Sequence, residues 1–246
     1  MPRFNWCNGV VLAACILAVG GVYPRAGEQT KRGGTDRKAS DKKTRLTPEE
    51  CERLVEQLVN PGKPPFTGKG MPVLPKGVSV DTIEEKQKKV KPAYDKLSAN
   101  IEVALPVLAK HANDERFSYV YIQPISGVYK TESVGGACST IIHEHVEVYH
   151  QHTSRPRDDE GRSSSLYFIF NGCGGVDKWW KDRKHKTLAE LQLEGIEWVL
   201  RQKKPEYFKS ERDWARAKTA LEKMAKEIRD SGKPIKVNHE FYSELE

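Results

Sequence analysis

The sequence lacks the short motifs by which the commonest enzyme classes are recognised. It has no GxSxG nucleophile elbow, no phosphate-binding P-loop, no GxGxxG dinucleotide motif and no HExxH metalloprotease motif. Its five cysteines include no CxxC pair, so zinc sites built on that spacing are also missing. The familiar hydrolase, nucleotide-binding and zinc-finger classes therefore have no support in the sequence.

Acidic residues are scarce at the N-terminal end, and this imbalance accounts for most of the net charge of +7. Residues 1–45 hold nine basic and three acidic residues, whereas residues 46–246 hold 32 basic and 31 acidic ones. A nucleic-acid-binding domain carries its basic charge on the folded part. We therefore expect no nucleic-acid partner.

Residues 1–27 are typical of a secretory signal peptide. Arg3 precedes the apolar run VVLAACILAVGGV, residues 10–22, which has the length of a signal-peptide core and is short for a bilayer span. Small residues allow cleavage between positions 20 and 27. As an alternative, the Leu-Ala-Ala-Cys pattern that ends at Cys15 fits a bacterial lipobox. We expect an exported protein, periplasmic or secreted, or else a lipoprotein anchored through Cys15.

The remaining chain divides into three parts by composition. Residues 28–45 contain almost no hydrophobic side chain and predict a disordered basic linker. Residues 46–232 are expected to form a single α-helical domain, and residues 233–246 a C-terminal tail. The linker is interpreted as a tether that contacts anionic envelope polymers through its charge.

The fold class predicted for the domain is mostly α, with five to six helices in a compact HEAT-like or irregular bundle. Capping boxes at Thr47 and Thr187, and cap residues at Asp81 and Ser210, predict where four helices begin. Residues 92–112 and 133–150 carry apolar residues at helical spacing. Residues 117–130, rich in β-branched and aromatic side chains, predict a short strand or hairpin.

Three cysteines remain once a signal peptide is removed, namely Cys51, Cys138 and Cys173. In an exported protein this number allows one disulfide and one free thiol. Cys173 lies in the glycine-rich stretch NGCGG, and we predict a bridge between Cys138 and Cys173, with buried free thiols as the alternative.

The stretch HEHVEVYHQH, residues 143–152, is the richest in chemistry. On a helix, His143, Glu147 and His150 share one face and are candidate metal ligands. The apolar stripe lies on another face, and an exposed helix face offers no walled pocket. We therefore expect these three side chains to cover a solvated face, and we predict no metal or other cofactor.

The stretch GGACS, residues 135–139, suggests a second catalytic alternative, in which Cys138 or Ser139 reacts beside the histidines. Its glycines, however, fall inside a helical pattern, where they favour close packing of the backbone. We predict that packing role, and no catalytic residue is assigned.

One segment resembles a known repeat family. Residues 104–142 contain Pro106 in a first helix, then the turn Asp114-Glu-Arg116-Phe-Ser, then the helix that begins Val134-Gly-Gly-Ala-Cys. This order resembles a single HEAT-type helical unit, and it is similar to uncharacterised exported bacterial proteins with a D-x-R-[FY]-S turn. The loop between the helices is longer than a HEAT turn, and no second copy follows. The resemblance implies a helical scaffold used for binding.

The predicted function is therefore that of an exported, non-enzymatic helical module that binds an envelope protein or polymer. Only the signal peptide, or a lipid on Cys15, would bring it to the membrane. The alternative is a metal- or Cys/His-dependent hydrolase centred on residues 143–152.

Overall fold

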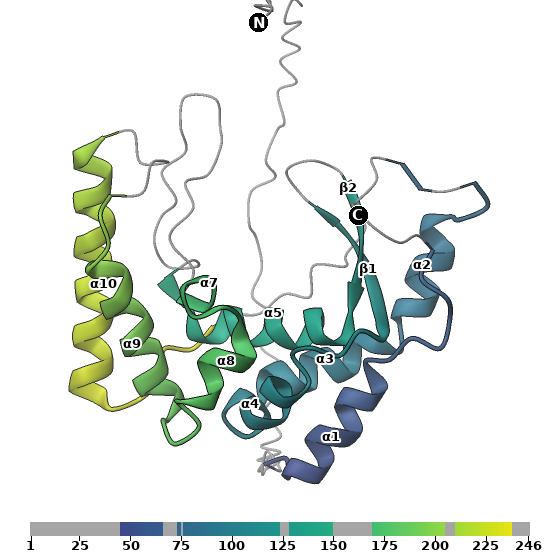
Figure 1. Cartoon of the computed structure of the whole chain (residues 1–246), viewed down its shortest axis with the longest axis horizontal. Coiled ribbons are helices and arrows are strands. Elements are labelled where there is room, and N and C mark those ends of the chain that lie inside the picture. The colour runs from purple at the N-terminus through teal and green to yellow at the C-terminus, as the bar shows by residue number, and fades with distance from the viewer. Residues whose placement is uncertain are drawn as a thin grey trace, which may run out of the picture. The chain divides into compact units, whose positions relative to one another are not determined.

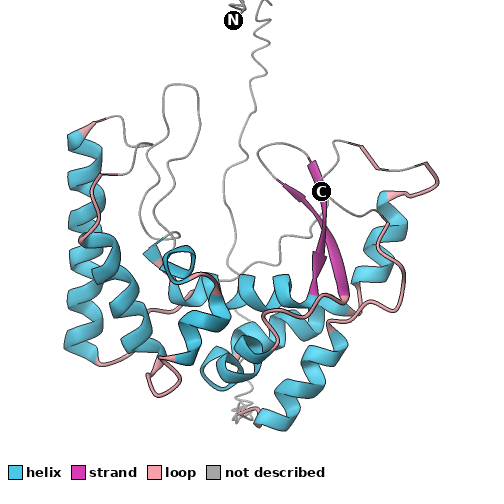
Figure 2. Ribbon diagram, viewed as in Figure 1, coloured by secondary structure: helices cyan, strands magenta, loops and turns pink. Residues whose placement is uncertain are grey.

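The structure, a computed structural model, describes residues 45–65, 73–74, 76–123, 128–149, 169–204 and 210–237. The predicted signal peptide and nearly all of the predicted linker lie outside these ranges. The described part is mostly helical with one antiparallel hairpin, as the sequence predicts (Figures 1 and 2). Its elements are α1 (Pro48–Gln57), α2 (Val80–Gln87), α3 (Val90–Ala99), α4 (Ile101–Lys110), β1 (Phe117–Gln123), β2 (Val128–Ser133), α5 (Val134–Val146), α7 (Ile169–Cys173), α8 (Val176–Lys181), α9 (Leu188–Leu200) and α10 (Glu211–Ser231). None of the described helices has both the length and the apolar character that a bilayer span requires.

Three of the four predicted helix starts are confirmed. Thr47 and Thr187 form capping boxes with Glu50 and Glu190, and Ser210 caps α10. The fourth start was predicted two residues too late, because the Ser79 hydroxyl, not the Asp81 carboxylate, accepts the backbone N–H of Thr82 at 3.2 Å. Asp81 lies in the first turn of α2, where its negative charge interacts favourably with the helix dipole.

The long helix predicted over residues 92–112 is two helices. The chain leaves helical geometry at Asn100, where φ is −121° and ψ is 33°. The Asn100 side chain donates to the Lys96 carbonyl at 2.9 Å and so satisfies a group that the end of α3 would leave unpaired. Pro106 lies inside α4 and has no N–H to donate. The helix therefore has one backbone hydrogen bond fewer at this position.

The core has two main parts. The larger one joins apolar side chains of α1, α3, α4, α5, α7 and α8, with Trp179 among its largest wholly buried side chains. The second lies between α9 and α10, which run side by side (Figure 1), and also takes in Val148 and Tyr149. A small third cluster, built on Ile83 and Val120, lies where α2 contacts β1.

The predicted C-terminal tail is partly bound to the domain. The Gln192 side chain accepts the backbone N–H of Ile235 at 2.7 Å and donates to the Ile235 carbonyl at 3.0 Å. Ile235 and Val237 also pack against the second core cluster. Residues up to Val237, beyond the predicted end of the domain at residue 232, therefore pack on the helices. The Gln192 amide holds this segment through the two backbone groups of Ile235.

Candidate functional site

The structure brings together two of the three candidate metal ligands. Nε2 of His143 lies 2.8 Å from Oε2 of Glu147, one turn further along the chain. The side chain of His143 is 32% exposed, while that of Glu147 is completely buried. The third candidate, His150, lies outside the described residues.

The predicted solvated face is wrong at Glu147. Its other carboxylate oxygen accepts the backbone N–H of Ile169, the first residue of α7, at 2.6 Å. Burial and the nearby Glu147 carboxylate, which also hydrogen-bonds the phenol, raise the pKa of Tyr149 well above its usual value. Glu147 therefore connects three parts of the fold within the core.

Glu147 turns inward because α5 is shorter than predicted. The helix ends at Val146, and Glu147 takes non-helical angles, with φ −92° and ψ 51°. The chain then leaves the helix axis, and this change places Val148 and Tyr149 in the second core cluster. A continuous helix to residue 150 would have kept Glu147 on the surface.

The candidate nucleophile Cys138 is not an activated thiol. Cys51, Cys138 and Cys173 are free thiols, so the disulfide predicted between Cys138 and Cys173 is absent from the structure. Cys138 is wholly buried in the larger core cluster, and that burial raises the pKa of its thiol to about 12. Since the thiolate is the reactive form, Cys138 is an inert core residue at neutral pH.

A second histidine of the same stretch, His145, is buried. Nε2 of His145 lies 2.8 Å from the hydroxyl of Ser98 on α3. Burial lowers the pKa of His145 to about 4, so the ring is neutral at physiological pH. Its role is to join α5 to α3 within the core.

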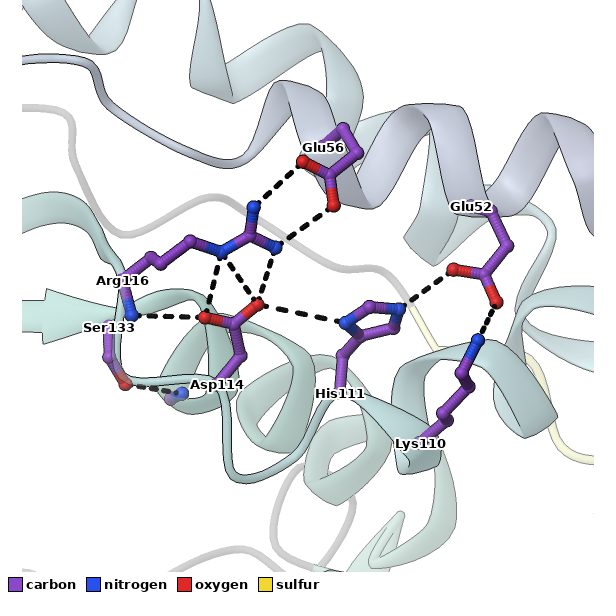
Figure 3. Close-up of polar contacts among 8 residues, drawn as sticks. Glu52, Glu56, Lys110, His111, Asp114, Arg116 and Ser133 are labelled. Atoms are coloured by element: carbon purple, nitrogen blue, oxygen red, sulfur yellow. Dashed lines mark hydrogen bonds and ion pairs between the residues drawn. The ribbon is translucent and has the colours of Figure 1, made fainter.

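The D-x-R turn noted in the sequence forms a surface network of ion pairs (Figure 3). The Arg116 guanidinium binds Glu56 of α1 through two bonds of 2.8 and 2.9 Å, and it binds Asp114 at 2.6 Å. His111 adds a contact of 2.7 Å to Glu52, which also binds Lys110. These charges neutralise one another, and the network joins α1 to the end of α4.

The glycine beside this turn has the packing role that the sequence predicts. The backbone N–H of Gly135 donates to the Asp114 carbonyl at 2.8 Å. A Cβ at Gly135 would lie 2.5 Å from the carbonyl oxygen of Ala112, closer than carbon and oxygen can approach. The network and the glycine therefore hold α1, the end of α4 and the start of α5 together.

A cavity of about 140 Å³ lies where α2 contacts β1, beside the end of α1. We call it the α2–β1 cavity. Its apolar wall includes Val78, Ile83, Phe117 and Val120. The side chains of Asn60 and Gln87 also line it, and they are only 6% and 4% exposed. A buried polar pair in an apolar wall is the usual composition of a ligand site.

Two buried polar atoms of residues that line this cavity lack a hydrogen-bond partner within the described part of the chain. They are the amide nitrogen Nδ2 of Asn60 and the amide oxygen Oε1 of Gln87. Buried polar groups are nearly always paired, so each such atom needs an explanation. Neither residue stands out in the sequence, where Asn60 precedes a proline as a helix stop and Gln87 lies among lysines.

Groups of three or more His, Cys, Asp or Glu side chains placed to hold a metal ion do not occur among the residues that the structure describes. The fold is thus a mostly helical scaffold with an inserted hairpin, and the α2–β1 cavity is its candidate site. Comparison with protein-family models, with curated proteins and with solved structures finds no match. Helices α4 and α5 pack on each other, while the HEAT-type resemblance of this unit stays a prediction.

Proposed function

We propose that this chain is an exported, non-enzymatic helical protein of the cell envelope, a binding module that receives its ligand in the α2–β1 cavity. The observation that carries the proposal is the cavity itself, in which apolar side chains such as Val78, Ile83 and Val120 lie beside the polar residues Asn60 and Gln87. An apolar pocket with a few polar groups is the usual form of a small-molecule site.

The surroundings of two candidate reactive side chains, Glu147 and Cys138, favour a binding protein over an enzyme. The carboxylate of Glu147 is used inside the core, and the Cys138 thiol is protonated and buried. The basic segment 28–45 would then link the module loosely to anionic envelope polymers, through contacts that salt weakens.

The binding proposal is tested by NMR of the isotope-labelled protein, titrated with small neutral, anionic and cationic compounds. We expect at least one compound to shift the backbone amide signals of Gly77, Val78 and Val120. The Val78→Trp variant, whose indole fills the cavity, should lose these shifts while its other signals stay in place. If no compound perturbs these signals, the cavity is not a ligand site and the proposal fails.

The rival class is a metal- or Cys/His-dependent hydrolase at residues 143–152, and the contact between His143 and Glu147 is its one structural support. Zinc at 100 times its dissociation constant would stabilise a protein with a specific site by roughly 2.7 kcal/mol. We expect zinc and chelator to leave the melting temperature unchanged. A zinc-dependent rise that is lost in His143→Gln would favour the rival.

A further inference from the structure

The polar side chains that line the α2–β1 cavity offer little to a ligand. Oδ1 of Asn60 accepts a backbone N–H two residues later at 3.0 Å, and Nε2 of Gln87 donates to the carbonyl of Val120. The opposite ends of both amides are wholly buried, so a ligand in the cavity does not reach them. The Thr82 hydroxyl is paired with the hydroxyl of Ser79 at 2.8 Å. The wall that remains for a ligand is therefore largely apolar.

The size of the cavity fits one small apolar group. Its volume is about 140 Å³, close to that of an apolar cavity of about 150 Å³ that binds benzene in a protein core. The side chains of Val78, Ile83 and Phe117 offer such a group apolar contacts. A group of about the size of a benzene ring therefore suits the cavity.

Lys63 supplies the charge of this site. Among the described residues that line the cavity it is the one with a charged side chain, and it is exposed. A lysine in such a place lays its methylene chain on apolar surface and keeps its ammonium group in water. Lys110 and Lys186 each contact a carboxylate at 2.7 Å, whereas Lys63 is in no ion pair within the described part of the chain. An anionic head on the ligand would pair with this ammonium group in solvent, outside the apolar wall where a charge is costly.

We propose that the α2–β1 cavity binds a small apolar carboxylate whose body is about the size of a benzene ring. The apolar body lies against the wall that includes Ile83 and Phe117, and the carboxylate stays in solvent beside the Lys63 ammonium group. The single charge of Lys63 matches that of a carboxylate, whereas a phosphate monoester carries nearly two negative charges at neutral pH. The inference rests on the proposed binding function and specifies the chemistry of the ligand.

The test compares benzoate with benzyl alcohol, a neutral compound that has the same ring. NMR titration of the Val78 and Val120 amide signals gives the dissociation constant of each. We expect benzoate to bind about threefold to fivefold more tightly, the range that an exposed ion pair supplies. Added sodium chloride should reduce this preference, because salt screens exposed charges. Acetate, which has the carboxylate without the ring, should leave the signals unchanged.

The Lys63→Met variant keeps most of the methylene chain but removes the ammonium group. Its affinity for benzoate should fall to that for benzyl alcohol, which should bind as it does to the native protein. Lys223→Met is the matched control, because Lys223 is also exposed but lies on α10 and does not line the cavity. It should keep the preference. A preference that persists in full in Lys63→Met would overturn the inference.

Four outcomes separate this inference from the binding function on which it rests. Equal binding of benzoate and benzyl alcohol to the native protein, or tighter binding of the cationic benzylamine, would overturn the inference and leave the cavity as a ligand site. Equal shifts with acetate and benzoate would overturn it as well, because the ring would then add nothing. If neither benzoate nor benzyl alcohol shifts the Val78 and Val120 signals, the inference fails, and the other compounds of the titration series decide the binding function.

Discussion

Glu147 and Ile169 are 22 residues apart in the chain, and a hydrogen bond of 2.6 Å joins the carboxylate of one to the backbone N–H of the other. This bond attaches the end of α5 to the start of α7. Because Glu147 is fully buried and also contacts His143, its role is to hold the two core clusters together. Glu147, the central carboxylate of the histidine-rich stretch 143–152, thus serves the stability of the fold.

Replacing Glu147 with alanine should lower the free energy of unfolding by about 1–3 kcal/mol, because the change leaves the backbone N–H of Ile169 buried without its acceptor. Glu147→Gln keeps an oxygen for Ile169 and should cost about 1 kcal/mol. Glu197→Ala, which removes an exposed ion pair with Arg229, is the control and should cost under about 0.5 kcal/mol. Urea unfolding measures all three, and an alanine variant as stable as the control would contradict the buried role.

The stability of the protein should depend on pH through His145. Its pKa falls from 6.5 to about 4 on folding, so the unfolded chain binds a proton more readily than the folded one. Stability is therefore full above pH 6.5 and falls between pH 6.5 and pH 4, by roughly 3 kcal/mol. Urea unfolding across this range measures the loss.

The matched variants for this pH dependence are His145→Gln and His185→Gln. His185 is exposed, so its replacement should leave the pH profile as it is in the native protein. His145→Gln should remove most of the decline. A decline that persists in full in His145→Gln would show that other groups cause it.

Gly135→Ala should destabilise the protein by about 1–3 kcal/mol, because the new methyl group meets the backbone of Ala112 and Asp114. Gly195 in α9 is the matched control. A Cβ there would lie 3.5 Å from the Tyr149 ring, an ordinary contact, and the helix gains rigidity. Gly195→Ala should therefore be neutral or slightly stabilising, and thermal unfolding of both variants decides whether close approach at Gly135 is required.

Export is tested on the protein made in a bacterial host with a secretion pathway. The apolar run at residues 10–22 predicts a mature N-terminus between residues 21 and 28, determined by N-terminal sequencing of the exported fraction. Limited proteolysis should then remove residues up to about Arg45 and leave a stable core. A full-length product in the cytoplasm, or a lipid on Cys15, would contradict this prediction.

Local signals in the sequence predicted the local structure well. The caps at Thr47, Thr187 and Ser210 depend on residues three positions apart, and all three helices begin there. The end of α10 was also predicted from a local signal, because Gly232 readily adopts the left-handed φ of 62° that ends the helix. The mostly helical fold with one hairpin follows from such short-range patterns.

Long-range contacts explain what the sequence could not predict. The break of α5 before Glu147 depends on the burial of Val148 and Tyr149 against helices that come much later in the chain. The α2–β1 cavity combines residues that follow α1, part of α2 and part of β1, so neither Asn60 nor Gln87 carries a local signal. Tertiary packing brings both residues to the cavity.

The most direct test of the central claim is the position of a bound small molecule in the α2–β1 cavity. Nuclear Overhauser effects between the protons of a compound that binds and the protein report contacts within about 5 Å, the range of packed side chains. The account predicts such effects to the methyl groups of Ile83 and Val120, and their loss in Val78→Trp. Effects to other residues alone, or none at a saturating concentration of the compound, would contradict it.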